Sequence, residues 1–135
     1  MKKIIYGFTL IELIIVLAIL AILTAVAVPT YSKIKMSSYK STVKSDVRNL
    51  VSRMVMLAIE INNIPSLSPN PCSNTCSLVF GSYSESFNIS QGVNLEIQNT
   101  LCSDGSSGFR VIGTHDRVPS WTYQYDYCTN QFLES

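Results

Sequence analysis

The sequence has few of the residues and motifs that enzymes use for chemistry. It contains one histidine, His115, and no Gly-x-Ser-x-Gly elbow, phosphate-binding loop or His-Glu-x-x-His motif. Asp104, Asp116 and Asp126 are too scattered along the chain to predict a calcium loop. His115 is expected in an exposed turn, because Pro119 follows it closely. We therefore expect no catalytic residue, no metal site and no cofactor.

Polar residues are nearly absent from a stretch near the amino terminus. The 21 residues from Phe8 to Val28 include only three polar ones, namely Thr9, Glu12 and Thr24. At about 1.5 Å per residue, a helix of this length can cross the hydrocarbon core of a bilayer. An ionised acid in hydrocarbon costs on the order of 3 kcal/mol, so Glu12 needs a partner. Cleavage after Gly7 would supply the positive amino group of Phe8, from the same chain or a neighbouring one.

The residues Gly7-Phe8-Thr9-Leu10-Ile11-Glu12, followed by the apolar run, resemble the class III signal peptide of bacterial type IV pilins. In that family a dedicated peptidase cuts after the glycine and methylates the new amine, which assigns these roles to Gly7 and Phe8. The resemblance implies that Glu12 docks the helix into a filament by neutralising the amine of another subunit. Pro29 matches the family's helix-kinking proline, whereas Ala21 stands where many relatives have glycine. The resemblance covers about the first 32 residues.

Two ordinary membrane segments are alternatives. A secretory signal peptide has a basic start, an apolar core of about 7 to 15 residues and an Ala-x-Ala site, which Ala25-Val26-Ala27 would supply. The apolar core here is longer and contains Glu12, which favours the pilin-type signal. A plain single-pass anchor explains the span but neither Gly7 nor Glu12.

Charge is divided unevenly along the chain. Residues 1–32 carry a net charge of +1, residues 33–53 carry +5 and residues 54–135 carry −5. Basic residues that flank a span usually stay in the cytoplasm, which opposes export of residues 33–53. We still expect the carboxyl end outside, because four cysteines in a short chain indicate an oxidising compartment. The basic side chains are expected to be solvated or to face acidic surfaces of neighbouring subunits, with nucleic acid less favoured.

Proline is absent between Pro29 and Pro65, and apolar residues recur there every three or four positions. This spacing predicts an amphipathic helix whose stripe packs on a sheet, rather than an isolated coiled coil. The stripe consists of Met36, Tyr39, Val43, Val47, Leu50, Met54, Leu57 and Ile61. Joined to the apolar run, it predicts one helix from about Phe8 to Asn63, with Pro29 as a candidate bend.

The remaining residues predict a small β-sheet. Residues 65–77 are rich in proline and serine and predict a loop. Apolar runs after them predict an antiparallel sheet of three to five strands over the amphipathic helix. These runs are 78–80, 87–89, 93–97, 109–112 and 121–127. The last contains the aromatic row Trp121, Tyr123, Tyr125 and Tyr127, which is interpreted as packing on the helix rather than as a stacking surface for single-stranded DNA or a sugar.

The predicted fold class is therefore α+β, in the pilin layout. Its parts are a cleaved leader (1–7), a membrane and filament-core half of the helix (8–32), an amphipathic half (33–64) and a disulfide-stapled sheet head (65–135). From sequence alone, Cys72, Cys76, Cys102 and Cys128 permit three pairings. The resemblance implies a Cys102–Cys128 bridge, because many type IV pilins close a carboxyl-terminal loop in this way. A zinc site at these cysteines with His115 lacks paired Cys-x-x-Cys spacing and is disfavoured.

These features predict a structural subunit, not an enzyme, that polymerises into a type IV pilus for adhesion, motility or DNA uptake. Before assembly it would cross the inner membrane once with its carboxyl end outside, and afterwards it would be extracellular. Family likeness implies a prepilin peptidase, an assembly ATPase, a platform protein and a secretin as partners. The alternatives are a minor or competence pilin that binds DNA and a pseudopilin of type II secretion.

Overall fold

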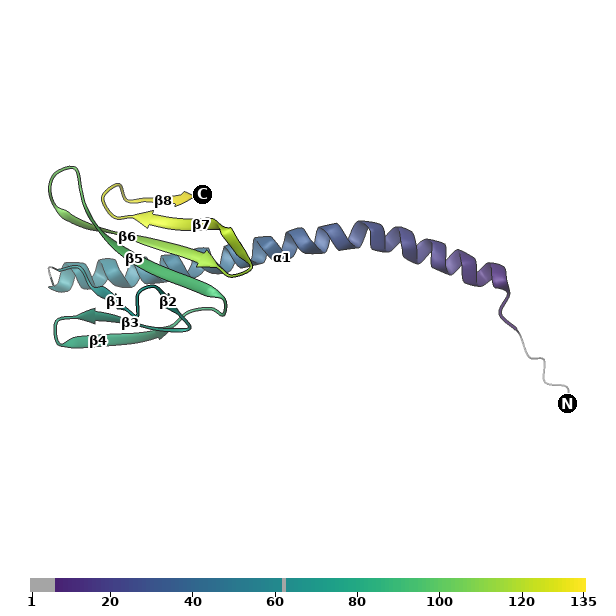
Figure 1. The fold of residues 1–135 in the computed structure, drawn as a ribbon, viewed down its shortest axis with the longest axis horizontal. Helices are drawn as coiled ribbons and strands as arrows, with labels where there is room; N and C mark the ends of the chain where they lie inside the picture. The colour runs from purple at the N-terminus through teal and green to yellow at the C-terminus, as the bar shows by residue number, and fades with distance from the viewer. Residues whose placement is uncertain (1–6, 62) are drawn as a thin grey trace. The chain divides into compact units, whose positions relative to one another are not determined.

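The computed structural model describes residues 7–61 and 63–135 (Figure 1). Helix α1 spans Leu10–Ile61, and the chain divides into two compact units, Met1–Lys35 and Met36–Ser135. The long helix followed by antiparallel sheets confirms the α+β fold class and is consistent with the pilin fold. The helix was expected to begin at Phe8, but it begins two residues later, at Leu10, because Thr9 caps its first turn. The first six residues of the predicted leader lie outside the described residues.

The carboxyl-terminal half of α1 contributes one buried face to the core. Val43, Val47, Leu50 and Met54 are each no more than 1% exposed, as the three-and-four spacing predicts. The predicted stripe is wrong at its beginning, because Met36 is 47% exposed. The other members of the stripe are less informative: Tyr39 and Leu57 are partly buried, and nothing is described of the Ile61 side chain.

The larger sheet has five antiparallel strands in the order β2-β5-β6-β7-β8. Their bounds are β2 Cys72–Ser73, β5 Val93–Leu101, β6 Ser107–His115, β7 Val118–Asp126 and β8 Gln131–Glu134. Every second residue of β6 from Phe109 to His115 is buried, as the two-residue period of a strand requires. Gly113 lets the helix approach this face, because a Cβ there would lie 2.7 Å from Val43 Cγ1 and closer still to Val47.

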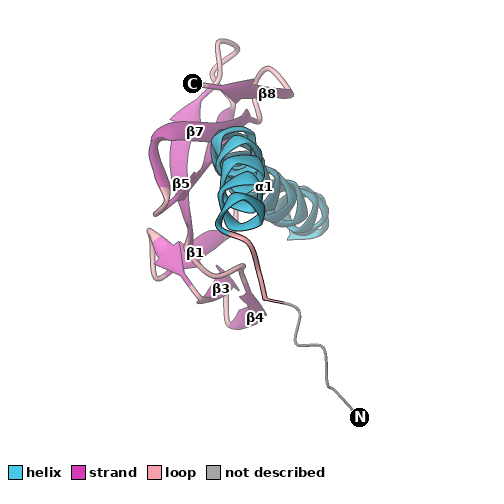
Figure 2. Ribbon diagram, turned by 90° about the vertical axis from the view of Figure 1, so that its right-hand side faces the viewer, coloured by secondary structure: helices cyan, strands magenta, loops and turns pink. Residues whose placement is uncertain are grey.

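A second sheet has three antiparallel strands in the order β1-β3-β4. The strands are β1 Ser66–Ser68, β3 Thr75–Phe80 and β4 Tyr83–Asn88. Figure 2 shows the strands in two groups beside α1, one with β5, β7 and β8 and the other with β1, β3 and β4. Two expectations were therefore wrong: residues 65–77 are not a simple loop, and the strands form two sheets rather than one. Leu67 and Leu78 are buried and stand opposite each other in the smaller sheet, which explains why this polar segment folds.

The aromatic row of β7 packs in the core as expected, except at its end. Trp121, Tyr123 and Tyr125 are 7%, 3% and 4% exposed. Tyr127 follows the end of β7 and is 39% exposed, although its ring still stacks on Phe109 with centroids 4.8 Å apart. The prediction that Tyr127 packs in the core relied on the alternation of a strand, but β7 ends at Asp126, one residue before it.

His115 does not lie in an exposed turn. It is the last residue of β6, is 5% exposed, and packs against the Tyr39 ring of α1 in a tilted arrangement with centroids 4.4 Å apart. Its Nδ1 accepts a hydrogen bond from the Arg117 backbone nitrogen at 3.0 Å. The turn begins one residue later, so His115 stays on the core face of the strand.

Candidate processing and assembly site

The predicted cleavage site lies in an exposed, non-helical segment just before α1. Gly7, Phe8 and Thr9 are all exposed, and Phe8 is 81% exposed. A Cβ at Gly7 would have no heavy atom within 4 Å, and Gly7 is not among the glycines with positive φ. The described fold therefore places no demand for glycine at this position. A requirement for Gly7 would have to come from an enzyme that binds this segment.

Thr9 and Glu12 form a capping box at the first turn of α1. The Thr9 backbone nitrogen and hydroxyl donate to Glu12 Oε2 at 2.9 and 2.7 Å, and the Glu12 backbone nitrogen donates to Thr9 Oγ1 at 3.3 Å. This reciprocal pairing satisfies amide groups that have no partner within the helix. The Glu12 carboxylate thus has a local partner in the uncut chain. Sequence analysis missed this partner, although Thr-x-x-Glu before an apolar run is its signature.

The residues after this cap leave an apolar helix surface uncovered. Among the described residues, α1 is the one helix long and apolar enough to cross a membrane, and its most apolar window has a mean hydropathy of 3.0 with no part buried. The Thr24 hydroxyl donates to the Leu20 carbonyl at 2.9 Å, so its hydrogen needs no acceptor outside the helix. Pro29 lies inside α1, where it cannot donate a backbone hydrogen bond. Glu12 is therefore the ionisable residue of an otherwise apolar surface.

Residues 3–28 match the family described as the Prokaryotic N-terminal methylation motif. The chain carries the class III signal peptide of type IV pilins. Searches of curated proteins and of solved structures found no match. The motif supports a type IV pilin or pseudopilin-like protein, and it implies processing by prepilin peptidase and assembly into a pilus-type filament. Together with the apolar helix, it fits a membrane-anchored prepilin that becomes extracellular.

Three cations of this pilin-like chain lie on the aromatic residues of the larger sheet. The Lys40 and Lys44 amines lie 5.0 and 5.5 Å from the ring centroids of Trp121 and Tyr123, and the Arg48 guanidinium lies 5.6 Å from that of Phe132. A cation within about 6 Å of a ring face is attracted by the electrons of the ring. The charged groups of these three side chains therefore lie over aromatic rings of β7 and β8.

Two salt bridges connect α1 to the edge strands of both sheets. Lys44 pairs with Glu134 of β8, and Arg53 pairs with Glu85 of β4. The hydrogen bond from Lys44 is the main reason why the pKa of Glu134 is below its usual value. Lys44 therefore has an acidic partner within its own chain, whereas the prediction that these basic side chains face the acidic heads of neighbours stays a prediction. The pair could not be found from sequence because 90 residues separate its members.

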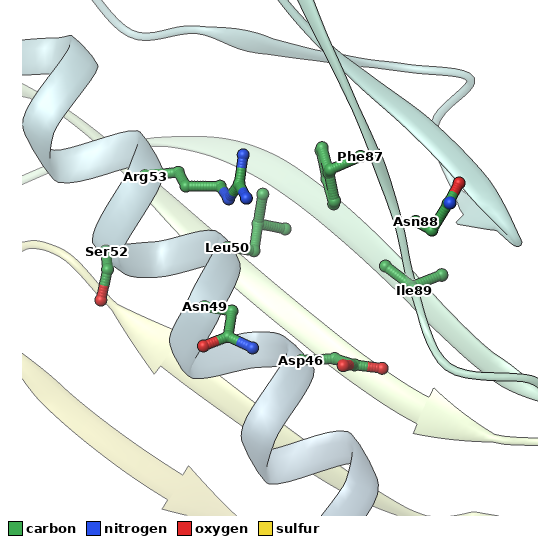
Figure 3. Close-up of a pocket in the computed structure, with 8 residues that line it drawn as sticks. All are labelled: Asp46, Asn49, Leu50, Ser52, Arg53, Phe87, Asn88 and Ile89. Atoms are coloured by element: carbon green, nitrogen blue, oxygen red, sulfur yellow. The ribbon is translucent and has the colours of Figure 1, made fainter.

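A groove of about 410 Å³ lies between α1 and the end of β4 (Figure 3). Its lining residues are Asp46, Asn49, Leu50, Ser52, Arg53, Phe87, Asn88 and Ile89. Both of its charged groups already have partners. Asp46 accepts from the Ser90 backbone nitrogen at 2.9 Å and from its hydroxyl at 3.3 Å, while Arg53 pairs with Glu85. These contacts attach β4 and the segment after it to the helix.

Two disulfides constrain the head. Cys102 pairs with Cys128, the pairing that the pilin resemblance implies, and Cys72 pairs with Cys76. A Cβ on Gly108 would lie 2.6 Å from Cys128 Sγ and 2.8 Å from Cys102 Sγ, so glycine leaves room for the larger-loop bridge. All four cysteines are paired, and the described residues contain no group of three or more side chains that could hold a metal ion.

Asp126 organises the chain beside the Cys102–Cys128 bridge. Its carboxylate accepts from the Arg110 guanidinium at 2.7 Å and from the Cys128 backbone nitrogen at 2.9 Å. The hydrogen bond from Arg110 is the main reason why the pKa of Asp126 is lowered. Sequence analysis considered Asp126 only as a calcium ligand and missed this role, for which the chain carries no local signal.

Proposed function

We propose that the chain is a structural subunit, not an enzyme, that polymerises into a type IV pilus filament. The observation that carries this proposal is a carboxylate, Glu12, at the start of a helix whose following apolar surface is uncovered. In water such a surface would drive aggregation, so it needs lipid or other apolar helices around it. A membrane-stored subunit that later packs its helix with others meets this requirement at both stages.

Glu12 would act differently before and after cleavage. In the uncut chain its carboxylate is held by Thr9. Cleavage after Gly7 creates a positive amine on Phe8, and methylation of an amine leaves the charge in place. A Glu12 carboxylate surrounded by apolar helices would then favour an arriving helix whose amine lies at the same depth. This pairing would set the axial stagger between subunits.

The contacts of the head support a structural role over nucleic-acid binding. Stacking of bases requires exposed aromatic faces, whereas Trp121, Tyr123 and Tyr125 are each less than 8% exposed. The amines of Lys40 and Lys44 lie on these rings rather than away from them. We therefore rank the DNA-binding minor pilin below the major structural subunit. The type II secretion pseudopilin remains the second candidate, since the same signal peptide supports it.

The proposal is tested by mass spectrometry of filaments sheared from the surface of cells that produce the chain. The expected result is an abundant mature chain that begins at N-methylated Phe8 and has lost four hydrogens through two disulfides. Processed chain that is abundant in the membrane and absent from sheared filaments would contradict the pilus subunit and favour the pseudopilin.

A further inference from the structure

The basic residues of α1 divide into two groups by their contacts. Lys40, Lys44, Arg48 and Arg53 each lie on an aromatic ring of a sheet, and Lys44 and Arg53 also form salt bridges. Lys33 and Lys35 come earlier, and both are exposed. Within the described residues neither forms a salt bridge, and the Lys35 amine lies 5.6 Å from the centroid of the Tyr31 ring.

The position of Lys33 and Lys35 along the helix matches the headgroup layer of a membrane. The apolar run ends at Val28, and at about 1.5 Å per residue Lys33 follows it by about 7.5 Å and Lys35 by about 10.5 Å. Polar headgroups add roughly 5 to 7.5 Å on each side of the hydrocarbon. The backbone of Lys33 therefore lies at the outer edge of the headgroups, and that of Lys35 lies about 3 Å beyond it.

The Lys35 side chain points back toward the apolar run. Side chains on a helix tilt toward its amino terminus, and a lysine can extend its amine along a surface to reach a favourable layer. The contact of the Lys35 amine with Tyr31, one turn earlier, shows this direction. Tyr31 is 65% exposed, and tyrosine is enriched at the boundary between lipid and water.

We propose that Tyr31, Lys33 and Lys35 form a binding site for the headgroups of anionic phospholipids. The two amines would bind lipid phosphate groups while the Tyr31 ring lies at the boundary of the acyl chains. The inference rests on the membrane-anchored stage of the proposed function. Glu12 and Lys33 are 21 residues apart, about 31 Å along a helix, so the depth of one residue in the membrane determines the depth of the other. Headgroup binding at Lys33 would thereby fix the depth of Glu12.

An acidic side chain of a second subunit is the competing partner for these lysines. The lipid is favoured because Lys33 and Lys35 directly follow the apolar run, in the same compact unit. In contrast, all the acidic residues of the chain except Glu12 lie from Asp46 onward, in the other unit. The two partners predict different outcomes, because only lipid binding can be seen with single, unassembled subunits.

The test is native mass spectrometry of the full chain in detergent micelles that contain phosphatidylglycerol or, for comparison, phosphatidylcholine. Each lysine near an anionic surface contributes about 1 kcal/mol, which is about a fivefold change in affinity. We expect phosphatidylglycerol to be preferred, and the Lys33→Gln/Lys35→Gln variant to bind it about 25-fold more weakly. Lys33→Arg/Lys35→Arg should retain the preference. The control is Lys40→Gln, which removes a cation that lies on Trp121 and should leave lipid binding unchanged.

Three results would overturn the inference: equal binding of the two lipids, wild-type binding by the double glutamine variant, or a loss in Lys40→Gln as large as in that variant. If the double variant binds lipid normally while its filaments become sensitive to salt, the partner is an acidic neighbour and the inference is also wrong. Insertion of the full chain into vesicles of either lipid separates this failure from that of the proposed function. A chain that cannot insert contradicts the membrane-anchored stage itself.

Discussion

The Thr9 hydroxyl and the Glu12 carboxylate are 2.7 Å apart, and together they begin the long helix of this protein. The pair gives Glu12 two uses. In the uncut chain the carboxylate satisfies the Thr9 amide, whereas cleavage after Gly7 creates a charged amine on Phe8, four residues before Glu12. The Glu12 carboxylate, which the proposed function uses in assembly, is therefore hydrogen-bonded before any other chain is present.

Thr9→Ala should loosen the first turn of α1. Loss of a capping side chain costs about 1 kcal/mol, and here it also frees the Glu12 carboxylate. Amide hydrogen exchange in micelles should become faster at Leu10 to Leu13, and Thr9→Ser should restore the protection. Thr24→Ala is the matched control, because among the residues that the structure describes the Thr24 hydroxyl bonds to carbonyls of its own helix, those of Leu20 and Ala21. Unchanged exchange in Thr9→Ala would show that the cap does not stabilise this turn.

Gly7→Val should leave the precursor uncut while its fold stays intact. A side chain at Gly7 would meet nothing within 4 Å, so the change acts on recognition by the peptidase rather than on folding. Intact-mass analysis of membranes should show the full-length chain for Gly7→Val and a mature chain from Phe8 for the wild type. A mature chain that begins at Val28 would instead indicate an ordinary signal peptidase acting after Ala25-Val26-Ala27.

The stability of the head should fall in acid through Asp126. Its pKa is lower in the folded chain than in the unfolded chain, chiefly because of Arg110. The contribution is therefore complete above the unfolded pKa and is lost as the pH falls through the folded pKa. Asp126→Asn should cost about 2 kcal/mol at neutral pH, typical of hydrogen bonds to a charged group, and should flatten the fall. Urea unfolding between pH 2 and pH 7 measures both effects. If the unfolding free energy of the variant falls with pH as steeply as that of the wild type, other carboxylates cause the acid sensitivity.

Reversing the charges of Lys40, Lys44 and Arg48 to glutamate should destabilise the subunit itself. These side chains lie on Trp121, Tyr123 and Phe132, and Lys44 pairs with Glu134. Each exposed contact is worth under about 1 kcal/mol, so the triple variant should lose about 2 kcal/mol of unfolding free energy. Urea unfolding of unassembled subunits is the measurement. If the variant unfolds like the wild type but forms filaments that break at low salt, these residues act at the interface between subunits.

The sequence predicts the helix and the core face of β7 because both depend on local periodicity. The burial of Val43 and Val47 follows from the helical repeat, and that of Trp121 and Tyr123 from the strand repeat. The burial of His115 also had a signal, since it is in phase with Phe109 and Val111 on β6. His115 was instead expected in a turn because Pro119 follows closely, although β6 extends to His115. Strand β1 was missed because three residues beside prolines carry too little pattern.

Contacts between distant parts of the chain could not be predicted in the same way. Lys44 and Glu134 meet only because β8 lies at the edge of a sheet that packs on α1, and the division into two sheets depends on such pairings. The motif from Gly7 to Glu12 is different, because all its members lie within six residues. It could therefore be found from sequence, apart from the hydrogen bonds of the capping box.

Glu12→Gln should separate membrane storage from assembly. Glutamine can still accept a hydrogen bond from Thr9, so the cap, insertion and cleavage should stay largely intact. It cannot neutralise an amine, and removing one partner of a buried charge pair costs about 3 to 5 kcal/mol because the other charge is left uncompensated. Mature subunit in the membrane should be normal while sheared filaments are strongly reduced, with both measured in the same cells. Thr9→Ala is the companion variant, because it disturbs the cap but retains the charge. Normal filaments from Glu12→Gln would show that the stagger between subunits is set by other contacts.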